Sequence, residues 1–403
     1  MGKLRQGKKY WCVVAVLCGL AASSVGLCIN SVGVFYAPAA EDLGILRGTF
    51  SMHVTIASIV TAVAALFAPR WMKERTFKPI LTAGVFLSGI STCLMAFASA
   101  MPVFYLFGTL RGIGNAAYGM VMLTVIVNRW FAARHGLATS IVLSFGGIAG
   151  AVCSPILTAV IERAGWRVGY VVMGILMIVF CIPAILYPFS ISPETEGLKP
   201  YGAEEAPKTE EDRKETDRRK FSYLSVPFAA MLMVGVLHTA ITCLPQHFPG
   251  FSQSIGNTAA VGAVMLSFCM MGNIISKLLI GVLADLWSSM KATVFMIGLH
   301  LLSIIMLLVF RSEVLLYGAA FLFGFVYSVS AVGLVLITKA CFGAENYSRA
   351  YPVISFAGGV SCAVGMSLVG YLFDFTGSYQ AAFLTAALFH VIDLGLLFLA
   401  RRS

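Results

Sequence analysis

Charged residues are scarce in this chain of 403 residues. Asp, Glu, Lys and Arg make up 11% of it, against about 25% in an average soluble protein, and apolar residues make up 59%. So little charge cannot cover the surface of a soluble protein of this size. This excludes a soluble enzyme, a disordered chain and a fibrous protein. A protein that crosses the membrane several times remains.

The alternating segments of about ten residues that are typical of membrane barrels are also missing. The apolar runs are instead about 20 residues long, the length that an α-helix needs to cross a bilayer. We therefore predict an all-α membrane protein with twelve transmembrane helices in two pseudo-symmetric six-helix bundles. The predicted spans are 10–38, 48–69, 78–98, 101–127, 136–161, 167–189, 223–247, 258–283, 291–310, 314–338, 347–372 and 379–400.

Paired cysteine spacings and histidine clusters are absent as well. The ten Cys lie in or at the ends of apolar runs, so we expect them to pack between helices, without disulfides, a metal site or a cofactor. The six His are scattered along the chain, which disfavours a membrane enzyme. The net charge of +10 does not indicate a nucleic-acid partner, because the basic residues lie in short gaps between apolar runs.

The distribution of these basic residues predicts the orientation. With the N-terminus inside, the cytoplasmic segments carry 22 Lys and Arg and the outer segments carry 4. Positive residues accumulate on the cytoplasmic side, so both termini are predicted there, in a multi-pass protein of the plasma membrane or the bacterial inner membrane. The one long polar stretch, 190–222, is then a charged cytoplasmic linker between bundles 1–189 and 223–403.

The two halves resemble each other in sequence. Ser144-Phe-Gly-Gly147 in the fifth span recurs as Ser355-Phe-Ala-Gly-Gly359 in the eleventh, and two shorter matches lie at nearly the same offset. Duplicated six-helix halves are typical of secondary transporters, which move around a central site.

Several motifs resemble those of the major facilitator superfamily. Gly281-Val-Leu-Ala-Asp285, followed by Lys291, is similar to the family's cytoplasmic loop between spans 8 and 9, and the copy at 69–75 is degenerate. Within the superfamily the chain is most similar to the monocarboxylate and oxalate/formate transporter branch. The segments similar to that branch are 31–36, 128–138, which contains Arg134, and His247 with 272–281.

Two cations lie inside predicted spans. A Lys or Arg at mid-helix costs about 2.5–3.5 kcal/mol on insertion scales and usually faces an interior cavity. Lys277 occupies the position where the resembled branch has an Arg that pairs with the substrate carboxylate, so we predict substrate binding there; the alternative is snorkelling to the headgroups. Arg111 is either a substrate group or a residue that bonds neighbouring helices.

Arg111 begins a stripe at helical spacing that continues through Asn115, Tyr118 and Met122. A cation, an amide and a phenol on one face fit a cavity wall. Tyr118 has a counterpart, Tyr327, on the symmetry-related tenth span, and each is either an anion-binding phenol or a packing residue.

Histidines in the second half have two interpretations. His238, near the middle of the seventh span, is either bonded to a neighbouring helix or linked to a proton. His390 and Asp393 lie three residues apart on the twelfth span and are predicted to pair with each other in a structural role. No role is predicted for His300.

No acidic residue falls mid-span on the predicted cavity helices. Asn273 stands where relatives in the branch have a proton-accepting Asp, and Asn30 where they have a Lys. We include both in the predicted substrate site. One firm central cation fits a monoanion better than a dianion.

The predicted function is secondary transport of small organic anions, namely monocarboxylates, by alternating access with proton symport. The alternatives are carboxylate exchange and efflux of amphipathic compounds, which the many Phe and Met would permit. Lys277 can release a proton and an Arg cannot, which favours symport. The resemblance implies gating roles for Asp285, Lys291, Gly281 and Arg134. The partners are a small carboxylate, protons and the lipid bilayer, and we expect a monomer.

Overall fold

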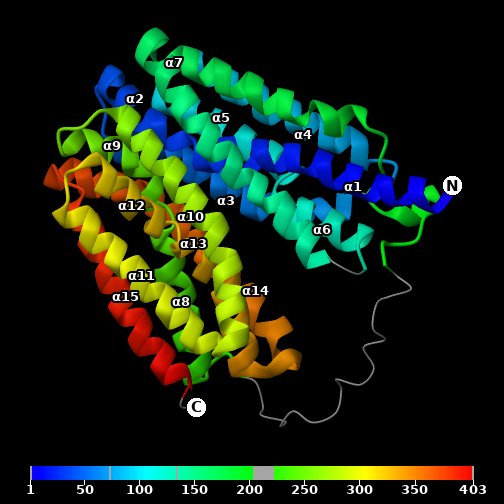
Figure 1. Ribbon diagram of the computed structural model, residues 1–403. Helices are drawn as coiled ribbons and strands as arrows, with labels where there is room; N and C mark the ends of the chain where they lie inside the picture. The colour runs from blue at the N-terminus through cyan, green and yellow to red at the C-terminus, as the bar shows by residue number, and fades with distance from the viewer. Residues whose placement is uncertain (1, 72–73, 133–134, 203–221, 402–403) are drawn as a thin grey trace. The chain divides into compact units, whose positions relative to one another are not determined.

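The computed structural model describes residues 2–71, 74–132, 135–202 and 222–401. Helices dominate, and they group into two compact units whose helices are labelled in Figure 1. Unit 1 consists of residues 1–35 and 56–214, and unit 2 of residues 36–55 and 215–403. Much of the predicted linker, residues 203–221, lies outside the described residues.

Unit 1 is built from helices that begin at the N-terminus. Its elements are α1 (Gly2–Ala21), the π-helical η1 (Ala22–Asn30), η2 (Val32–Phe35), the latter part of α3 (Arg47–Trp71), α4 (Phe77–Leu94), η3 (Met95–Phe97), α5 (Met101–Ala116), α6 (Met120–Trp130), α7 (His135–Leu186) and η4 (Pro193–Glu196).

Unit 2 contains the remaining helices. Its elements are α2 (Tyr36–Leu43), the start of α3, α8 (Val226–Ile241), η5 (Leu244–His247), α9 (Phe248–Ser254), α10 (Ala259–Leu286), α11 (Ser289–Val309), α12 (Glu313–Phe323), α13 (Val326–Ser328), the π-helical η6 (Val329–Gly333), α14 (Leu334–Thr376) and α15 (Gln380–Arg401).

The described residues contain 11 helical stretches that are long and apolar enough to cross a membrane. One of them, Ile141–Leu186, has 46 residues and contains two spans. Gly165 interrupts it with a φ of 84° and a ψ of 160°, between the predicted spans 136–161 and 167–189. Glycine adopts a positive φ without the strain that a Cβ causes. The twelve-helix prediction is therefore confirmed.

The predicted stripe on the fourth span is not one continuous helix. Helix α5 ends at Ala116, and the carbonyl oxygen of Asn115 accepts the N–H groups of Tyr118 (3.3 Å) and Gly119 (2.7 Å) in a turn. Tyr118 lies in this turn, and Met122 lies on the next helix, α6. The tenth span is also broken, because Gly324 and Phe325 separate α12 from α13.

The start of α3 is attached to the end of α14 within unit 2. The carboxylate of Asp374 accepts the N–H groups of Arg47 (3.1 Å) and Gly48 (2.8 Å), two N-terminal donors that have no partner in their own helix. The guanidinium of Arg47 lies 4.3 Å from the ring centre of Phe373 and donates to the hydroxyl of Tyr379 at 3.3 Å.

Two glycines of α10 differ in their surroundings. A Cβ at Gly272 would overlap the carbonyl oxygen of Phe321 on α12, whereas a Cβ at Gly281 would meet nothing within 4 Å. Small residues allow membrane helices to approach closely.

We therefore expect Gly272→Ala to lower the free energy of unfolding by about 1–3 kcal/mol, because α10 and α12 must separate. Gly281→Ala, on the same helix, is the control and should leave stability unchanged. Thermal unfolding of the two purified variants in detergent measures this difference. Equal melting temperatures would contradict the close contact.

Candidate functional site

Arg111 on α5 is a buried cation that forms no ion pair with the residues that the structure describes. Arg111 is 2% exposed, and its Nη1 has no hydrogen-bond partner among the described residues. An uncompensated buried charge costs several kcal/mol, so this site is suited to receive an anion.

Other polar atoms near Arg111 also lack partners. The hydroxyl oxygens of Ser24 on η1 and Ser88 on α4, and Oδ1 of Asn115, make no hydrogen bond with described residues. The Cys28 thiol lies beside Ser88 and within electrostatic range of Arg111. We call Ser24, Cys28, Ser88, Arg111, Asn115 and Tyr118 the unit 1 polar cluster.

The remaining bonds of this cluster attach it to the first span. Asn115 donates through Nδ2 to the carbonyl oxygen of Ser24 at 3.4 Å, and the hydroxyls of Tyr118 and Ser23 are 3.3 Å apart. The sequence predicted Arg111, Asn115 and Tyr118. It gave no signal for Ser24 and Ser88, because serines are common in packed membrane helices.

Asn30 lies at the end of η1 and contacts α7. Its Nδ2 donates to the carbonyl oxygen of Gly146 at 3.1 Å, and a Cβ added at Gly150 would lie 2.7 Å from the Asn30 Cβ. The described contact of Asn30 is thus a bond between helices. Its predicted part in substrate binding stays a prediction.

Lys277 on α10 is a half-buried cation of unit 2 without an ion-pair partner among the described residues. Its ammonium makes no hydrogen bond with any residue that the structure describes. Asn273 lies one turn earlier on α10 and is 8% exposed; its Oδ1 lacks a partner, and its Nδ2 lies 3.9 Å from the sulfur of Met270. Both groups remain available to a ligand.

His238 belongs to a buried group that the sequence did not predict. Its Nε2 lies 3.1 Å from the carbonyl oxygen of Val326, and its Nδ1 lies 3.4 Å from Oδ2 of Asp393. His390 Nδ1 lies 3.6 Å from the same oxygen, and His390 Nε2 lies 2.5 Å from Nδ1 of His300. The predicted His390–Asp393 pair is thus part of a group of four.

Tyr327 forms a second contact between α8 and the tenth span. Its hydroxyl donates to the carbonyl oxygen of Thr242 at 3.1 Å, directly after the Val326 carbonyl that His238 contacts. The break in the tenth span is therefore bonded to α8 at two consecutive residues.

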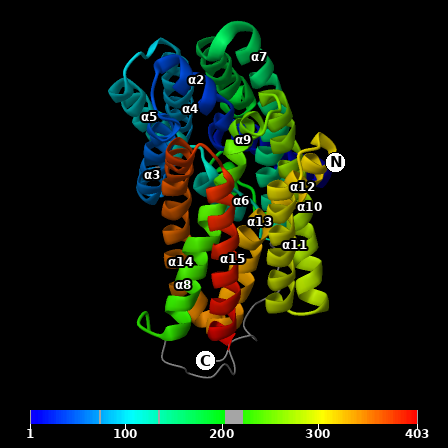
Figure 2. The ribbon, with the colours of Figure 1, turned by 90° about the vertical axis from the view of Figure 1, so that its left-hand side faces the viewer.

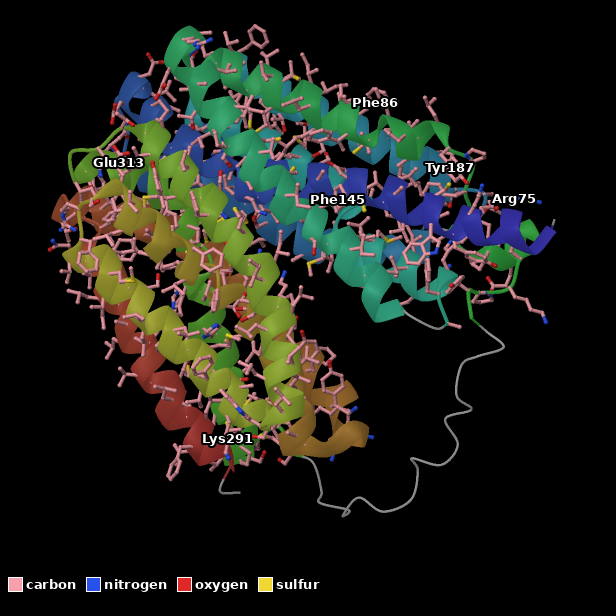
Figure 3. The ribbon with its side chains drawn as sticks, viewed as in Figure 1. Arg75, Phe86, Phe145, Tyr187, Lys291 and Glu313 are labelled. Carbon is pink, nitrogen blue, oxygen red and sulfur yellow. The ribbon has the colours of Figure 1, made fainter. Side chains whose placement is uncertain are left out.

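The predicted gating residues lie at helix ends where they are described. Asp285 occupies the last turn of α10, but its side chain lies outside the described part, as does Arg134 entirely. Lys291 is exposed near the start of α11, where its N–H donates to the hydroxyl of Ser288 at 3.3 Å. Figure 3 shows Lys291 and Glu313 at opposite ends of unit 2.

A pocket in unit 2 contains none of the predicted site residues. It lies between α8, α14 and α15, and its lining is apolar except for Ser361 and Thr385. A carboxylate would lose its hydration there without gaining a charged partner. The pocket is therefore unsuited to a small anion.

Comparison with known proteins decides the family. The model of the Major Facilitator Superfamily matches residues 18–313, which is more than half of the chain. The chain belongs to the major facilitator superfamily. This confirms the resemblance noted in the sequence motifs, and it makes the protein a multi-pass membrane transporter of small molecules.

Relatives within the superfamily include named monocarboxylate transporters. The chain is 25% identical to monocarboxylate transporter 12 of Rattus norvegicus over 387 residues, covering 88% of this chain and 79% of the relative. It is also 25% identical to the uncharacterized MFS-type transporter YcxA of Bacillus subtilis, covering 87% of this chain and 85% of the relative. The predicted proximity to the monocarboxylate branch is confirmed.

Solved structures agree on the fold. The nucleoside transporter NupG has a TM-score of 0.72 at 11% identity and covers 97% of this chain and 98% of its own. A bacterial homologue of the human lysosomal transporter Spinster has a TM-score of 0.68 at 12% identity, covering 98% of this chain and 97% of its own. At these identities the likeness concerns the fold alone, and the twelve-helix superfamily fold is confirmed.

Proposed function

We propose that this transporter carries small monocarboxylates across the plasma membrane by alternating access, in symport with protons. The observation that carries the proposal is Arg111, a buried guanidinium without a described counterion. The names of the relatives in the monocarboxylate branch support the same substrate class.

The chemistry around Arg111 favours a carboxylate. Guanidinium groups bind carboxylates with two parallel hydrogen bonds, and such charge-assisted bonds are stronger than neutral ones. The Ser24 and Ser88 hydroxyls could donate to an anion, while Oδ1 of Asn115 could accept from a substrate hydroxyl. An apolar efflux substrate would leave all these groups without partners.

Lys277 supplies the second part of the proposal. Its ammonium is free among the described residues of unit 2, and it stands where the resembled branch has an Arg for the carboxylate. A Lys holds an anion as a point charge with less control of orientation than the planar Arg fork. This fits small substrates better than large ones.

Further parts of the proposal concern the assembly in the membrane. Positive residues gather in the segments that would be cytoplasmic, so we place both termini inside the cell. We propose a monomer without catalytic activity, in which the linker 190–222 joins two moving bundles, 1–189 and 223–403.

A thermal-shift screen of the purified protein tests the substrate class. We expect stabilisation by formate, acetate, lactate or pyruvate, because a ligand that binds the folded state raises its melting temperature. Succinate, neutral sugars and hydrophobic cations serve as comparisons. Stabilisation by hydrophobic cations alone would favour the efflux alternative and contradict the proposal.

The gating prediction concerns Asp285 on the cytoplasmic end of α10. We expect Asp285→Asn to change the uptake rate by about tenfold while the equilibrium affinity changes only a few-fold, because helix-end charges act on the conformational equilibrium. Uptake kinetics and equilibrium binding are compared on the same preparation. A large loss of affinity at a normal rate would show that Asp285 recognises substrate instead.

A further inference from the structure

Four titratable residues meet in the interior of unit 2. His238 on α8, His300 on α11, and His390 and Asp393 on α15 are each 0% exposed. Helix α15 packs against both α8 and α11, and the three helices can be followed in Figures 1 and 2. We call these residues the His–Asp cluster. Among the described residues of the helices that meet here, these four side chains are the titratable groups that face one another.

The hydrogen bonds of His238 fix its tautomer. Its Nε2 lies 3.1 Å from the Val326 carbonyl oxygen, which only accepts, so Nε2 carries a proton. In the neutral ring Nδ1 then has a lone pair, and it lies 3.4 Å from Oδ2 of Asp393. Two acceptors cannot bond each other; Nδ1 of His238 has no other described hydrogen-bond partner, and the other group near Oδ2 is His390 Nδ1, at 3.6 Å. A shared proton between His238 and Asp393 satisfies both atoms.

Charge balance requires the same proton. An ionised Asp393 with neutral histidines would be a buried anion, and no Lys or Arg among the described residues pairs with it. Isolated ions are costly in a dry interior. One proton on His238, His390 or Asp393 makes the His–Asp cluster neutral.

A metal ion fits the cluster less well. The candidate ligand atoms of His238, His390 and Asp393 lie within 4.8 Å of one another, but they number three, whereas structural zinc takes four ligands. The nearby His300 is turned to His390 instead. A divalent ion would also leave one uncompensated positive charge in an apolar bundle.

The cluster is connected to the helix of Lys277. His238 contacts the carbonyl oxygen of Val326, just after the break at Gly324 and Phe325. A Cβ at Gly324 would lie 2.6 Å from the backbone nitrogen of Asn273, so the break packs directly on α10, one turn before Lys277. A change at His238 can therefore reach α10 through contacts within unit 2.

We propose that the His–Asp cluster binds the exchangeable proton that is transported with the anion, and passes its protonation state to α10 through Val326. This inference rests on the proposed proton symport, and it names the residues that bind the proton. It assigns the proton to this cluster and not to Lys277.

Proteoliposomes with Asp393→Asn separate proton coupling from transport. With labelled lactate as the probe, we expect exchange at equal pH to stay within a few-fold of wild type, because no net proton movement is needed. Accumulation driven by an inward proton gradient should fall by about tenfold or more, as expected when a coupling free energy is removed. Accumulation equal to wild type would overturn the proposal.

A matched control is available in unit 2. His247 is also buried, and its Nε2 lies 3.0 Å from the Met366 carbonyl oxygen. His247→Gln should keep proton-driven accumulation, whereas His238→Gln should lose it. His238→Gln also replaces Asp393→Asn if the latter does not fold, since Gln can still donate to Val326. Equal losses in both Gln variants would overturn the specific role of His238.

Two measurements on the substrate-free wild type separate this proposal from the substrate class. Infrared difference spectra over a series of pH steps should contain carboxyl and imidazole bands of a shared proton that either variant removes. Absence of those bands overturns the proton-binding role of the His–Asp cluster even if lactate is transported. Their presence supports that role even if no monocarboxylate is transported. Stoichiometric metal that survives a chelator and is lost in Asp393→Asn would replace the proton with a metal ion.

Discussion

Replacing Lys277 with alanine should abolish carboxylate binding and uptake, while Lys277→Arg should retain part of both. Truncating one partner of a buried charge pair costs about 2–5 kcal/mol, which corresponds to a loss of affinity of about 30-fold or more. Arg keeps the charge but changes its geometry. Equilibrium binding of labelled lactate to the purified variants measures the loss.

Lys291→Ala is the control for that experiment. Lys291 is exposed at the start of α11 in the same unit, so its loss should leave affinity within a few-fold. Undiminished binding by Lys277→Ala would exclude Lys277 from the substrate site and would favour its snorkelling to the headgroups.

Replacing Arg111 with methionine should abolish transport without lowering stability. Exchange of a buried ion for an apolar side chain of similar volume is often neutral or stabilising, by about 1–4 kcal/mol, and Arg111 has no described ion pair to lose. If Arg111 instead bonds neighbouring helices, its replacement should lower the melting temperature and leave lactate binding intact. Melting temperature and lactate uptake of the same preparation are the two measurements.

Arg47→Met provides the comparison. The guanidinium of Arg47 contacts Glu41, Phe373 and Tyr379, so its removal should lower the melting temperature. If Arg111→Met lowers it as much as Arg47→Met and still binds lactate, Arg111 is a structural residue and the proposed site in unit 1 is wrong.

The fold was predictable because its signals are local. Apolar runs of about 20 residues separated by basic gaps give the spans directly. The structure and the comparisons bear out twelve helices and the superfamily. The break at Ala117–Gly119 was missed because the residues keep helical spacing through it, and apolar periodicity does not report a turn.

The site was predictable only in part. Lys277 and Arg111 stand out because a cation inside an apolar run is rare. The His390–Asp393 pair was predicted from its spacing, but His238 and His300 were not assigned to it, because only the packing of α15 on α8 and α11 brings these distant residues together. Ser24 and Ser88 carried no signal, because an unpartnered hydroxyl is visible only once its neighbours are placed.

The central claim is that the protein moves a monocarboxylate together with a proton, and gradient-driven uptake into proteoliposomes tests it most directly. The account predicts that an inward proton gradient alone drives accumulation of labelled lactate and that succinate is not accumulated. Internal lactate should not be required. If the gradient drives no accumulation, and internal anion is needed for uptake, the protein is an exchanger and the account of symport is wrong.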